Sequence, residues 1–526
     1  MSARHLLNNA QNGNFEAAVQ VFLNYRDGTQ DFDKSEEQAQ IAFENAIRIL
    51  ESNFFLSEIN IYNFRKIINL KINLHKNLTV FIGENGAGKT SLLRAIQKNL
   101  SYFPAFILKE NTNGERIVDS DINNVAKKTG EVACLNCSFR MGADYRIDGQ
   151  LIREPKGITT DLRTEVMKYR KFGQNIRELI AYKKVNLPLF MFYDIDRFKS
   201  NENKKNLSNQ ENVFYQLDGY ERSSKSKVTF ENLIDWLVKL LKISNANVDS
   251  PEKTKIISQI DSLLEAGADN INNPLNELYE DLLSILRLYP EDEIKNKSKR
   301  IIDTLETIFR NIYSDLVQIQ LINDDDGEDK VALHLKDEII FLHQFSDGQR
   351  VLFGLVGDIA RRLILLNPIS SNPLNGNGIV LIDEIELHLH PSWQQKVILT
   401  LMESFPNVQF ILATHSPHVL STVDKNQIRV IKNNEIVSVS LQTKGVASSD
   451  ILEQIMETYS IPRTVTEAQW VEDYLETVRK DQYESIEAVD LYNRIVKHFG
   501  EEHPVISDIR NQIKIISIRK KMNQRG

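Results

Sequence analysis

The sequence predicts an α/β fold with a helical insertion and with helical N- and C-terminal extensions. Three observations lead to this prediction. A glycine-rich turn at 83–88 follows an apolar, strand-like run and precedes a run with helical periodicity. Two later apolar runs, at 379–382 and 408–413, each end in polar residues, as buried strands of a parallel sheet do. Apolar stripes at helical spacing occupy the first 50 residues, the stretch 228–318 and the last part of the chain.

The composition is that of an ordinary globular protein. Of the 526 residues, 41% are hydrophobic and 26% are charged. The formal net charge of −8 argues against a protein that coats nucleic acid over its whole surface. No apolar run reaches the roughly 18 residues of a membrane-spanning helix, and the first residues lack the apolar core of a signal peptide. We therefore expect a cytoplasmic protein without a membrane partner.

The first 52 residues predict helices. Ala17, Ala18, Val21 and Phe22 form one apolar stripe, and the run 39–50 supplies another. Their helix–turn–helix spacing is similar to one tetratricopeptide-like unit, which cannot bury its apolar face alone. We expect this extension to dock on the next domain or on a partner.

The run "FIGENGAGKT", residues 81–90, follows a stretch of strand alternation that starts at Phe55. It matches the pattern GxxxxGK[ST], which a chain of this length contains by chance on the order of once in a hundred. Glycines allow successive backbone N–H groups to face one anion at the start of a helix. Lys89 would then reach the β- and γ-phosphates of a nucleotide, and the Thr90 hydroxyl would bind Mg²⁺. The alternative is a glycine turn without a ligand.

The candidate phosphate-binding residues of this loop are Gly83, Glu84, Asn85, Gly86, Ala87, Gly88, Lys89, Thr90 and Ser91.

The middle of the chain carries weaker signals. Cys134 and Cys137 form a single CxxC; we interpret its alternating surroundings as a strand rather than a redox or zinc site, because zinc would need a second pair. The polar run 199–212 predicts a surface loop. Within 228–318, the residues 233, 236, 237, 240 and 241 form a helical stripe, and strand signals return from 316 to 345.

The run "GIVLIDEIELHLHP" predicts a buried strand that delivers Asp383 and Glu384 at its end. Ligands of parallel α/β sheets lie at the carboxyl ends of strands. Asp383 would hold Mg²⁺ through water, and Glu384 would polarise the water that attacks the γ-phosphate. The alternative is a strand that ends in solvated acids.

The run "VQFILATHSP" repeats this architecture and ends in Thr414, His415 and Ser416. His415 could sense the γ-phosphate through a hydrogen bond, although a structural histidine is an alternative. A zinc site made of His388, His390 and His415 is a second alternative.

The segment "FSDGQR", residues 345–350, places Ser346, Gly348 and Gln349 at the start of an amphipathic helix. This is a second anion-binding helix end. One nucleotide needs one phosphate loop, so we expect this helix end to cap the nucleotide of another subunit.

Together these four runs resemble five motifs of ABC-type ATPases, in the branch of the soluble SMC-like and OLD-like proteins. These motifs are the phosphate loop, the signature, the Walker B strand with the D-loop after it, and the H-switch. The resemblance covers residues 55 to about 440. With its helical ends, the chain looks like the ATPase subunit of Septu-type anti-phage systems, including the retron-associated kind. The resemblance implies an ABC-type P-loop ATPase head that uses ATP and Mg²⁺.

It also implies that Lys89, Glu384 and His415 are catalytic, that Thr90 and Asp383 hold Mg²⁺, and that Ser346, Gly348 and Gln349 contact nucleotide. Two departures stand out. No glutamine occupies a clear Q-loop position, so the Mg²⁺ ligand of that loop is unassigned. The D-loop reads "ELHLHP", which is usual in this branch but not in transporters.

OLD-like relatives carry an additional Toprim nuclease, which needs a glutamate and a DxD pair on a further α/β domain. The run 470–480 resembles the first element only faintly, and helices without a DxD follow it. We infer no intrinsic nuclease. In Septu systems cleavage belongs to a separate HNH-type subunit, and retron versions also involve a reverse transcriptase with its RNA-linked DNA. The basic run 519–525 could contact nucleic acid, or it is a solvated tail.

Two functions follow from these patterns. The first is a dimeric ATPase that controls an HNH-type nuclease in phage defence. The second is an SMC-like DNA-repair or chromosome-associated ATPase that binds DNA directly. The expected segments are an N-terminal helical extension (1–52), a first ATPase part (53–200), a helical insertion (201–318), a second ATPase part (319–445) and a C-terminal helical region (446–526).

Overall fold

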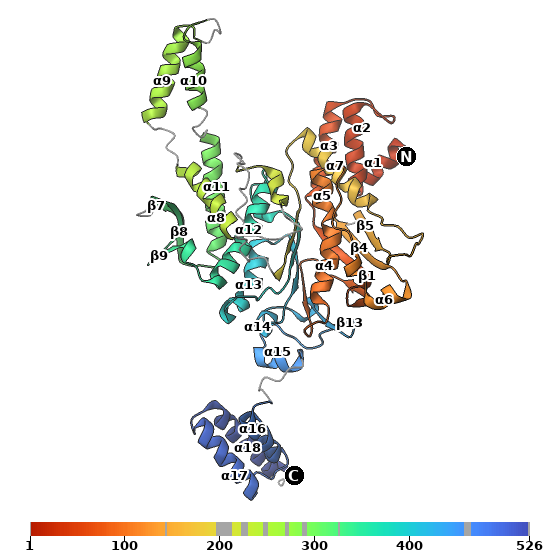
Figure 1. The fold of residues 1–526 in the computed structure, drawn as a ribbon, viewed down its shortest axis with the longest axis vertical. Coiled ribbons are helices and arrows are strands. Elements are labelled where there is room, and N and C mark those ends of the chain that lie inside the picture. The colour runs from red at the N-terminus through yellow and green to blue at the C-terminus, as the bar shows by residue number, and fades with distance from the viewer. Residues whose placement is uncertain are drawn as a thin grey trace. The chain divides into compact units, whose positions relative to one another are not determined.

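The computed structural model describes residues 2–142, 145–195, 213–221, 230–245, 251–268, 273–286, 292–323, 327–456 and 464–523. They form two compact units, Met1–Gly445 and Val446–Gly526 (Figure 1). The predicted surface loop at 199–212 lies outside the described residues.

An antiparallel sheet opens the α/β part of the first unit. Its order is β2-β1-β4-β5, with bounds β1 Phe54–Phe64, β2 Ile67–Asn73, β4 Ala133–Met141 and β5 Tyr145–Arg153. Residues alternate between a buried and a more exposed face along β5, as expected for a sheet with one face on the core. Cys134 and Cys137 are free thiols on β4, which confirms the predicted strand, and burial raises the pKa of Cys137.

The second sheet has the order β13-β12-β3-β11-β10-β6. The bounds are β3 Leu78–Ile82, β6 Leu189–Tyr193, β10 Gly378–Ile382, β11 Val408–Ala413, β12 Ile428–Lys432 and β13 Glu435–Ser438. Strands β12, β3, β11, β10 and β6 are parallel, and β13 pairs antiparallel with β12. Every residue of β3, β6, β10 and β11 is buried, because helices and the other sheet cover both faces. The carboxyl ends of these four strands therefore meet at one edge.

Helix α4, Lys89–Leu100, lies between the two sheets (Figure 1). It contacts β1 and β4 of one sheet and β10 and β11 of the other. Next to it, aromatic rings of α5 (Tyr102–Leu108), α7 (Met167–Tyr182) and both sheets form a connected cluster. Phe103 is central to the cluster, with ring centroids 4.9 Å from Phe139, 5.0 Å from Phe190 and 5.4 Å from Phe54.

A buried glutamine joins the two sheets. Gln409 on β11 is 1% exposed, and its Nε2 donates to the carbonyls of Leu56 and His75, each at 2.9 Å. Its Oε1 accepts from the Leu56 N–H at 2.8 Å. One side chain thus satisfies three backbone groups that the strand ladders leave unpaired, as buried polar groups require.

The N-terminal extension consists of α1 (Ala3–Gln11), α2 (Phe15–Asp27) and α3 (Glu36–Leu50). Side chains of Asn14 and Ser35 cap the starts of α2 and α3. The apolar stripe packs on α7: the Phe22 and Phe43 rings lie 5.0 and 5.1 Å from the Tyr182 ring. The expectation that this extension docks on the next domain is confirmed.

The insertion contains α8 (Phe230–Asn245), α9 (Pro251–Glu265), α10 (Asn276–Leu286) and α11 (Asp292–Phe309). The predicted stripe of α8 is buried throughout, at residues Leu233, Trp236, Leu237, Leu240 and Leu241, against α11 and α12 (Asp347–Leu366). Strands β7 (Leu316–Asn323), β8 (Asp329–Leu335) and β9 (Ile339–Phe341) follow. They form a three-stranded sheet of their own, an arrangement that alternation alone did not predict.

The second unit is helical. It contains α15 (Ser448–Gln454), α16 (Thr466–Arg479), α17 (Ile486–Phe499) and α18 (Pro504–Asn523). Val471, Tyr474, Val478, Ile495 and Ile506 belong to its core. Side chains of the basic run 519–525 lie outside those that the structure describes. Within the described residues, we find no helix with the length and apolar character needed to cross a bilayer.

We predict that Gln409→Leu destabilises the first unit. Leucine fits the buried space but leaves two carbonyls and one N–H without partners, and each unsatisfied group costs about 1–3 kcal/mol. The midpoint of thermal unfolding, measured by circular dichroism, should fall by several degrees. Gln38→Leu, at an exposed helical position, is the matched control and should leave the midpoint unchanged. Equal midpoints for both variants would contradict the role of Gln409.

Candidate nucleotide-binding and catalytic site

The phosphate loop connects β3 to α4 as the sequence predicts. Gly88 has a φ of 110° and precedes the first residue of α4, Lys89. The Ala87 N–H donates to the Glu84 carbonyl at 3.1 Å, which closes the turn. Gly86 has a φ of 82°, and a Cβ there would lie 2.8 Å from Lys66 Nζ. Residues 84–86 are exposed, so the loop presents its backbone to the exterior at the start of a helix.

Lys89 lies under this loop. Its ammonium group donates to the carbonyls of Gly83 at 2.8 Å and Glu84 at 3.2 Å, and the residue is 5% exposed. Burial lowers the pKa of Lys89, while the carboxylates of Asp383, Glu384 and Glu386 oppose that shift. Lys89 and these acids thus lie close enough to interact, at the sheet edge where β3 and β10 end.

The acids come from the end of β10. Asp383 is fully buried, and its N–H donates to the Tyr193 carbonyl at 2.9 Å. Glu384 follows with a φ of 45°, an uncommon backbone conformation for a residue other than glycine. Such strained residues cluster at functional sites. The turn places consecutive carboxylates at the strand end that the sequence predicts.

His415 follows β11, the strand next to β10. Burial lowers the pKa of His415 and the nearby Lys89 ammonium lowers it further, whereas Glu386 and Glu384 oppose the shift. The imidazole is therefore neutral at pH 7. His415 lies in the same electrostatic environment as Lys89, at the edge where both strands end.

The rival zinc site finds no support among the described residues, because no three His, Cys, Asp or Glu side chains there form a metal-binding group. His390 instead caps α13 (Pro391–Ser404) through its ring, and His388 is exposed in the preceding loop.

Sequence reasoning missed Glu386, Arg94, Asp194 and Lys66. Asp194 follows β6, whose last residue Tyr193 is level with Ile382 of β10, so its carboxylate lies at the same sheet edge. It forms an ion pair with Arg94, one turn after Thr90 on α4, and the Arg94 guanidinium lies 4.8 Å from the Phe192 ring centroid. A search for any polar residue after a buried strand, rather than for glutamine alone, would have found Asp194.

The signature segment starts α12 with a capping box. The Ser346 hydroxyl accepts from the Gln349 N–H at 3.4 Å, and the Ser346 N–H donates to Gln349 Oε1 at 2.9 Å. A Cβ on Gly348 would lie 2.7 Å from the His388 carbonyl, so only glycine permits this approach of α12 to the D-loop. Across the described residues, no hydrogen bond or ion pair joins the signature segment to the phosphate loop of the same chain. Ser346 is exposed.

A protein-family model described as "AAA ATPase domain" matches residues 55–420, which include the phosphate loop, the two strand-end motifs and the signature segment. The chain belongs to this ATPase family. The predicted α/β ATPase head with its helical insertion and extensions is confirmed by this match and by the observed sheets.

Three relatives of this ATPase extend the comparison. The "Retron Vc95 probable ATPase" of Vibrio cholerae serotype O1 biovar El Tor is 30% identical, over 86% of this chain and 88% of the relative. The "Retron Ec83 probable ATPase" of Escherichia coli is 27% identical, over 97% and 96%. The "Septu protein PtuA" of Bacillus mycoides (strain KBAB4) is 25% identical, over 76% of this chain and 44% of the relative. The resemblance to Septu-type and retron-associated ATPases is confirmed.

The ATPase site also fits Mg²⁺. Thr90 supplies a hydroxyl and Asp383 a buried carboxylate, and hard oxygen donors are what Mg²⁺ binds, in addition to water and substrate phosphates. These two residues remain the candidate ligands.

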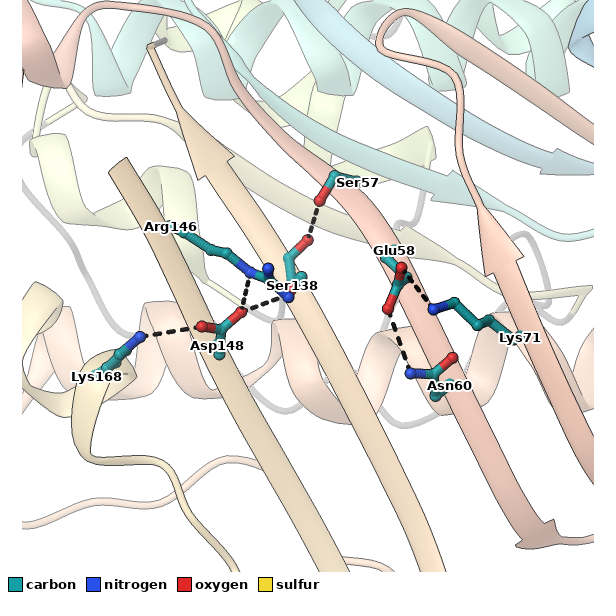
Figure 2. Close-up of polar contacts among 8 residues, drawn as sticks. All are labelled: Ser57, Glu58, Asn60, Lys71, Ser138, Arg146, Asp148 and Lys168. Carbon is teal, nitrogen blue, oxygen red and sulfur yellow. Dashed lines mark hydrogen bonds and ion pairs between the residues drawn. The ribbon is translucent and has the colours of Figure 1, made fainter. Parts of the chain in front are cut away.

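A polar cavity of about 500 Å³ lies elsewhere in this ATPase, on the face of the antiparallel sheet opposite the aromatic core. Figure 2 shows Asp148 on β5 beside Ser138, Arg146 and Lys168, and Glu58 on β1 paired with Lys71 at 3.2 Å. Burial alone would raise the pKa of Asp148, but its three partners outweigh burial and lower it. No lining residue belongs to the motifs above, so the cavity is separate from the nucleotide site.

Proposed function

We propose that this chain binds and hydrolyses ATP as a dimer and that it controls a partner nuclease in anti-phage defence. The observation that carries the proposal is the shared sheet edge, where Lys89, Asp383, Glu384 and His415 follow β3, β10 and β11. Lys89 and the loop N–H groups bind the phosphates, as in other P-loop ATPases. When bound, Mg²⁺ neutralises charge on the phosphate oxygens.

Glu384 accepts the proton of the attacking water. Its side chain is only partly buried, so water reaches it. His415, neutral at pH 7, donates an N–H to the γ-phosphate without adding a full charge. Both roles require the γ-phosphate to lie next to Lys89 at this sheet edge. Lys89 interacts electrostatically with both Glu384 and His415 there.

Dimerisation is supported by the signature segment. Ser346 is exposed at the start of α12, yet among the described residues the segment makes no hydrogen bond or ion pair to its own phosphate loop. A helix start with a serine suits an anion. We propose that Ser346, Gly348 and Gln349 complete the site of a second copy.

The defence role is supported by relatives that match nearly the whole chain and are named retron probable ATPases, together with PtuA of Septu. We propose an HNH-type nuclease as partner, and in a retron setting a reverse transcriptase with its RNA-linked DNA. The last 60 described residues form helices α16–α18 around an apolar core. This helical structure differs from the α/β domain of a Toprim nuclease and supports the proposal that another subunit cleaves nucleic acid.

Two variants should separate binding from hydrolysis. Lys89→Ala should lose ATP affinity, because the Lys89 ammonium is the buried one that bonds to the loop carbonyls. Glu384→Gln should bind ATP but hydrolyse it at least about 10²-fold more slowly, since the amide cannot accept the proton. Fluorescent-nucleotide binding and phosphate release measure the two effects. Wild-type affinity in the first variant, or wild-type turnover in the second, would refute the respective role.

Ser346→Arg should block hydrolysis and leave ATP binding at Lys89 largely intact, because a bulky side chain prevents closure on the other subunit's nucleotide. An equal mixture of this variant with Lys89→Ala should be active at about a quarter of all sites. About half of randomly paired dimers contain one copy of each variant, and one of the two sites in such a dimer is intact. Ser485→Arg, which removes a similar helix cap from α17, is the control for lost capping and should keep full activity. A monomer with full turnover at saturating ATP, and no recovery on mixing, argues against a shared site.

The partner can be tested by co-purification of this chain with the products of its neighbouring genes, followed by mass spectrometry. We expect an HNH-type nuclease in the complex, and we expect the isolated chain with Mg²⁺ and ATP to leave DNA and RNA intact. Retention of DNA by the pure chain, with no co-purifying nuclease, would favour the DNA-repair function instead. Cleavage that is lost on mutation beyond residue 465 would show an intrinsic nuclease.

A further inference from the structure

Glu386 lies at a junction that the proposed mechanism does not use. Its carboxylate accepts from two successive residues after β11: Oε2 from the Thr414 hydroxyl at 2.7 Å and Oε1 from the His415 N–H at 2.5 Å. Hydrogen bonds to an ionised carboxylate are about twice as strong as those between neutral groups. The side chain is half-buried, which limits competition from water. Glu386 thus fixes the backbone at His415.

The same glutamate is part of the loop that carries Glu384. The Leu389 N–H donates to the Glu386 carbonyl at 2.9 Å, and the Leu387 N–H donates to the Glu384 carbonyl at 3.0 Å. Between them, the Ile385 N–H donates to the Ala413 carbonyl at 3.2 Å. The loop between β10 and α13 is therefore a set of tight turns, joined to the end of β11 by one backbone bond and one carboxylate.

Two further contacts extend this connection. The Ser416 hydroxyl donates to Gln394 Oε1 at 2.6 Å, and Gln394 Nε2 donates to the Leu389 carbonyl at 2.8 Å. The same loop also lies against the start of α12, because the His388 carbonyl oxygen is 2.7 Å from the position that a Cβ on Gly348 would take. Contacts thus run continuously from His415 through Glu386 to the loop against which the signature helix starts.

We propose that Glu386 is a positioning residue that couples His415 to the D-loop and to the start of α12. It holds the His415 backbone so that the imidazole meets the γ-phosphate. Through the same loop, it also couples the position of the His415 imidazole to that of the signature segment at the start of α12. The proposal rests on the function proposed above, in which His415 contacts the γ-phosphate, and assigns Glu386 no contact with substrate.

The test is a double-mutant cycle on ATP turnover. Glu386→Ala should lower kcat by at least about 10-fold with KM within about 2-fold of wild type, because an interaction that matters in the transition state lowers kcat and kcat/KM together. In a His415→Ala background the same change should have less than about 2-fold effect, since residues that act through one another are not additive. Glu403→Ala, at an exposed position of the neighbouring helix α13, is the matched control and should be neutral in both backgrounds.

Conservative variants separate positioning from folding. Glu386→Gln keeps an oxygen for the His415 N–H but cannot accept from both donors with a full charge, so its kcat should lie between wild type and Glu386→Ala. Thr414→Val removes one of the two donors and should lower kcat less than Glu386→Ala does. The double variant should have the same kcat as Glu386→Ala alone. If Glu386→Ala does not fold, the cycle is run with Glu386→Gln.

The outcomes are distinct. Wild-type kcat in the folded Glu386 variants, or a loss that multiplies with that of His415→Ala, overturns the proposal while the ATPase function stands. Wild-type kcat in His415→Ala removes the γ-phosphate role of His415 and with it the premise of the proposal. A loss in Glu386→Ala as large as in Glu384→Gln and independent of His415 would make Glu386 itself the base.

Discussion

The functional part of this ATPase depends on one constraint, the parallel order of four fully buried strands. Because β3, β11, β10 and β6 run in one direction, the residue after each strand lies at the same edge. This order brings together residues that are far apart in the sequence, namely Lys89, Asp194 and His415. The order of the strands decides their neighbours: β11 lies between the phosphate-loop strand and the Walker B strand, so His415 lies between the loop and the acids.

Burial strengthens the interactions between charged groups at that edge. Lys89 and Asp383 are both strongly buried there and attract each other electrostatically, and interactions between charges are stronger where water is excluded. A second buried network fixes the frame around it: the Asp358 carboxylate accepts from Tyr193 at 2.8 Å and from Arg362 at 2.7 Å. Burial alone would raise the pKa of Asp358, but Arg362 and Arg361 outweigh it and lower the pKa. Helix α12, which starts at the signature segment, is thereby tied to the end of β6.

Much of this arrangement could be predicted from the sequence because it follows from local patterns. Apolar runs that end in Asp383 or Thr414 are recognisable as buried strands, and the glycines of the phosphate loop have a steric reason. The pairing of distant residues could not be predicted in the same way. Nothing local indicates that Gln409, inside an apolar strand, bonds to Leu56 and His75, or that Glu386 reaches the end of β11. Strands β7–β9 were predicted as strands, but their separate sheet depends on tertiary packing. Site roles, segment boundaries and a cytoplasmic location stay predictions.

The site is arranged so that a bound anion would change several interactions together. Lys89 Nζ donates to two carbonyls of its own loop, and its charge adds to burial in lowering the pKa of His415. A bound phosphate offers Lys89 a charged partner in place of neutral carbonyls, and the stronger hydrogen bond favours the exchange. The phosphate also compensates the ammonium charge that acts on the imidazole. In the proposed function, His415 would meet a different electrostatic field with phosphate bound, while Glu386 holds its backbone and the loop of Glu386 lies against Gly348. Short contacts through Glu386 and its loop therefore connect His415 at the end of β11 to the start of the signature helix at Gly348.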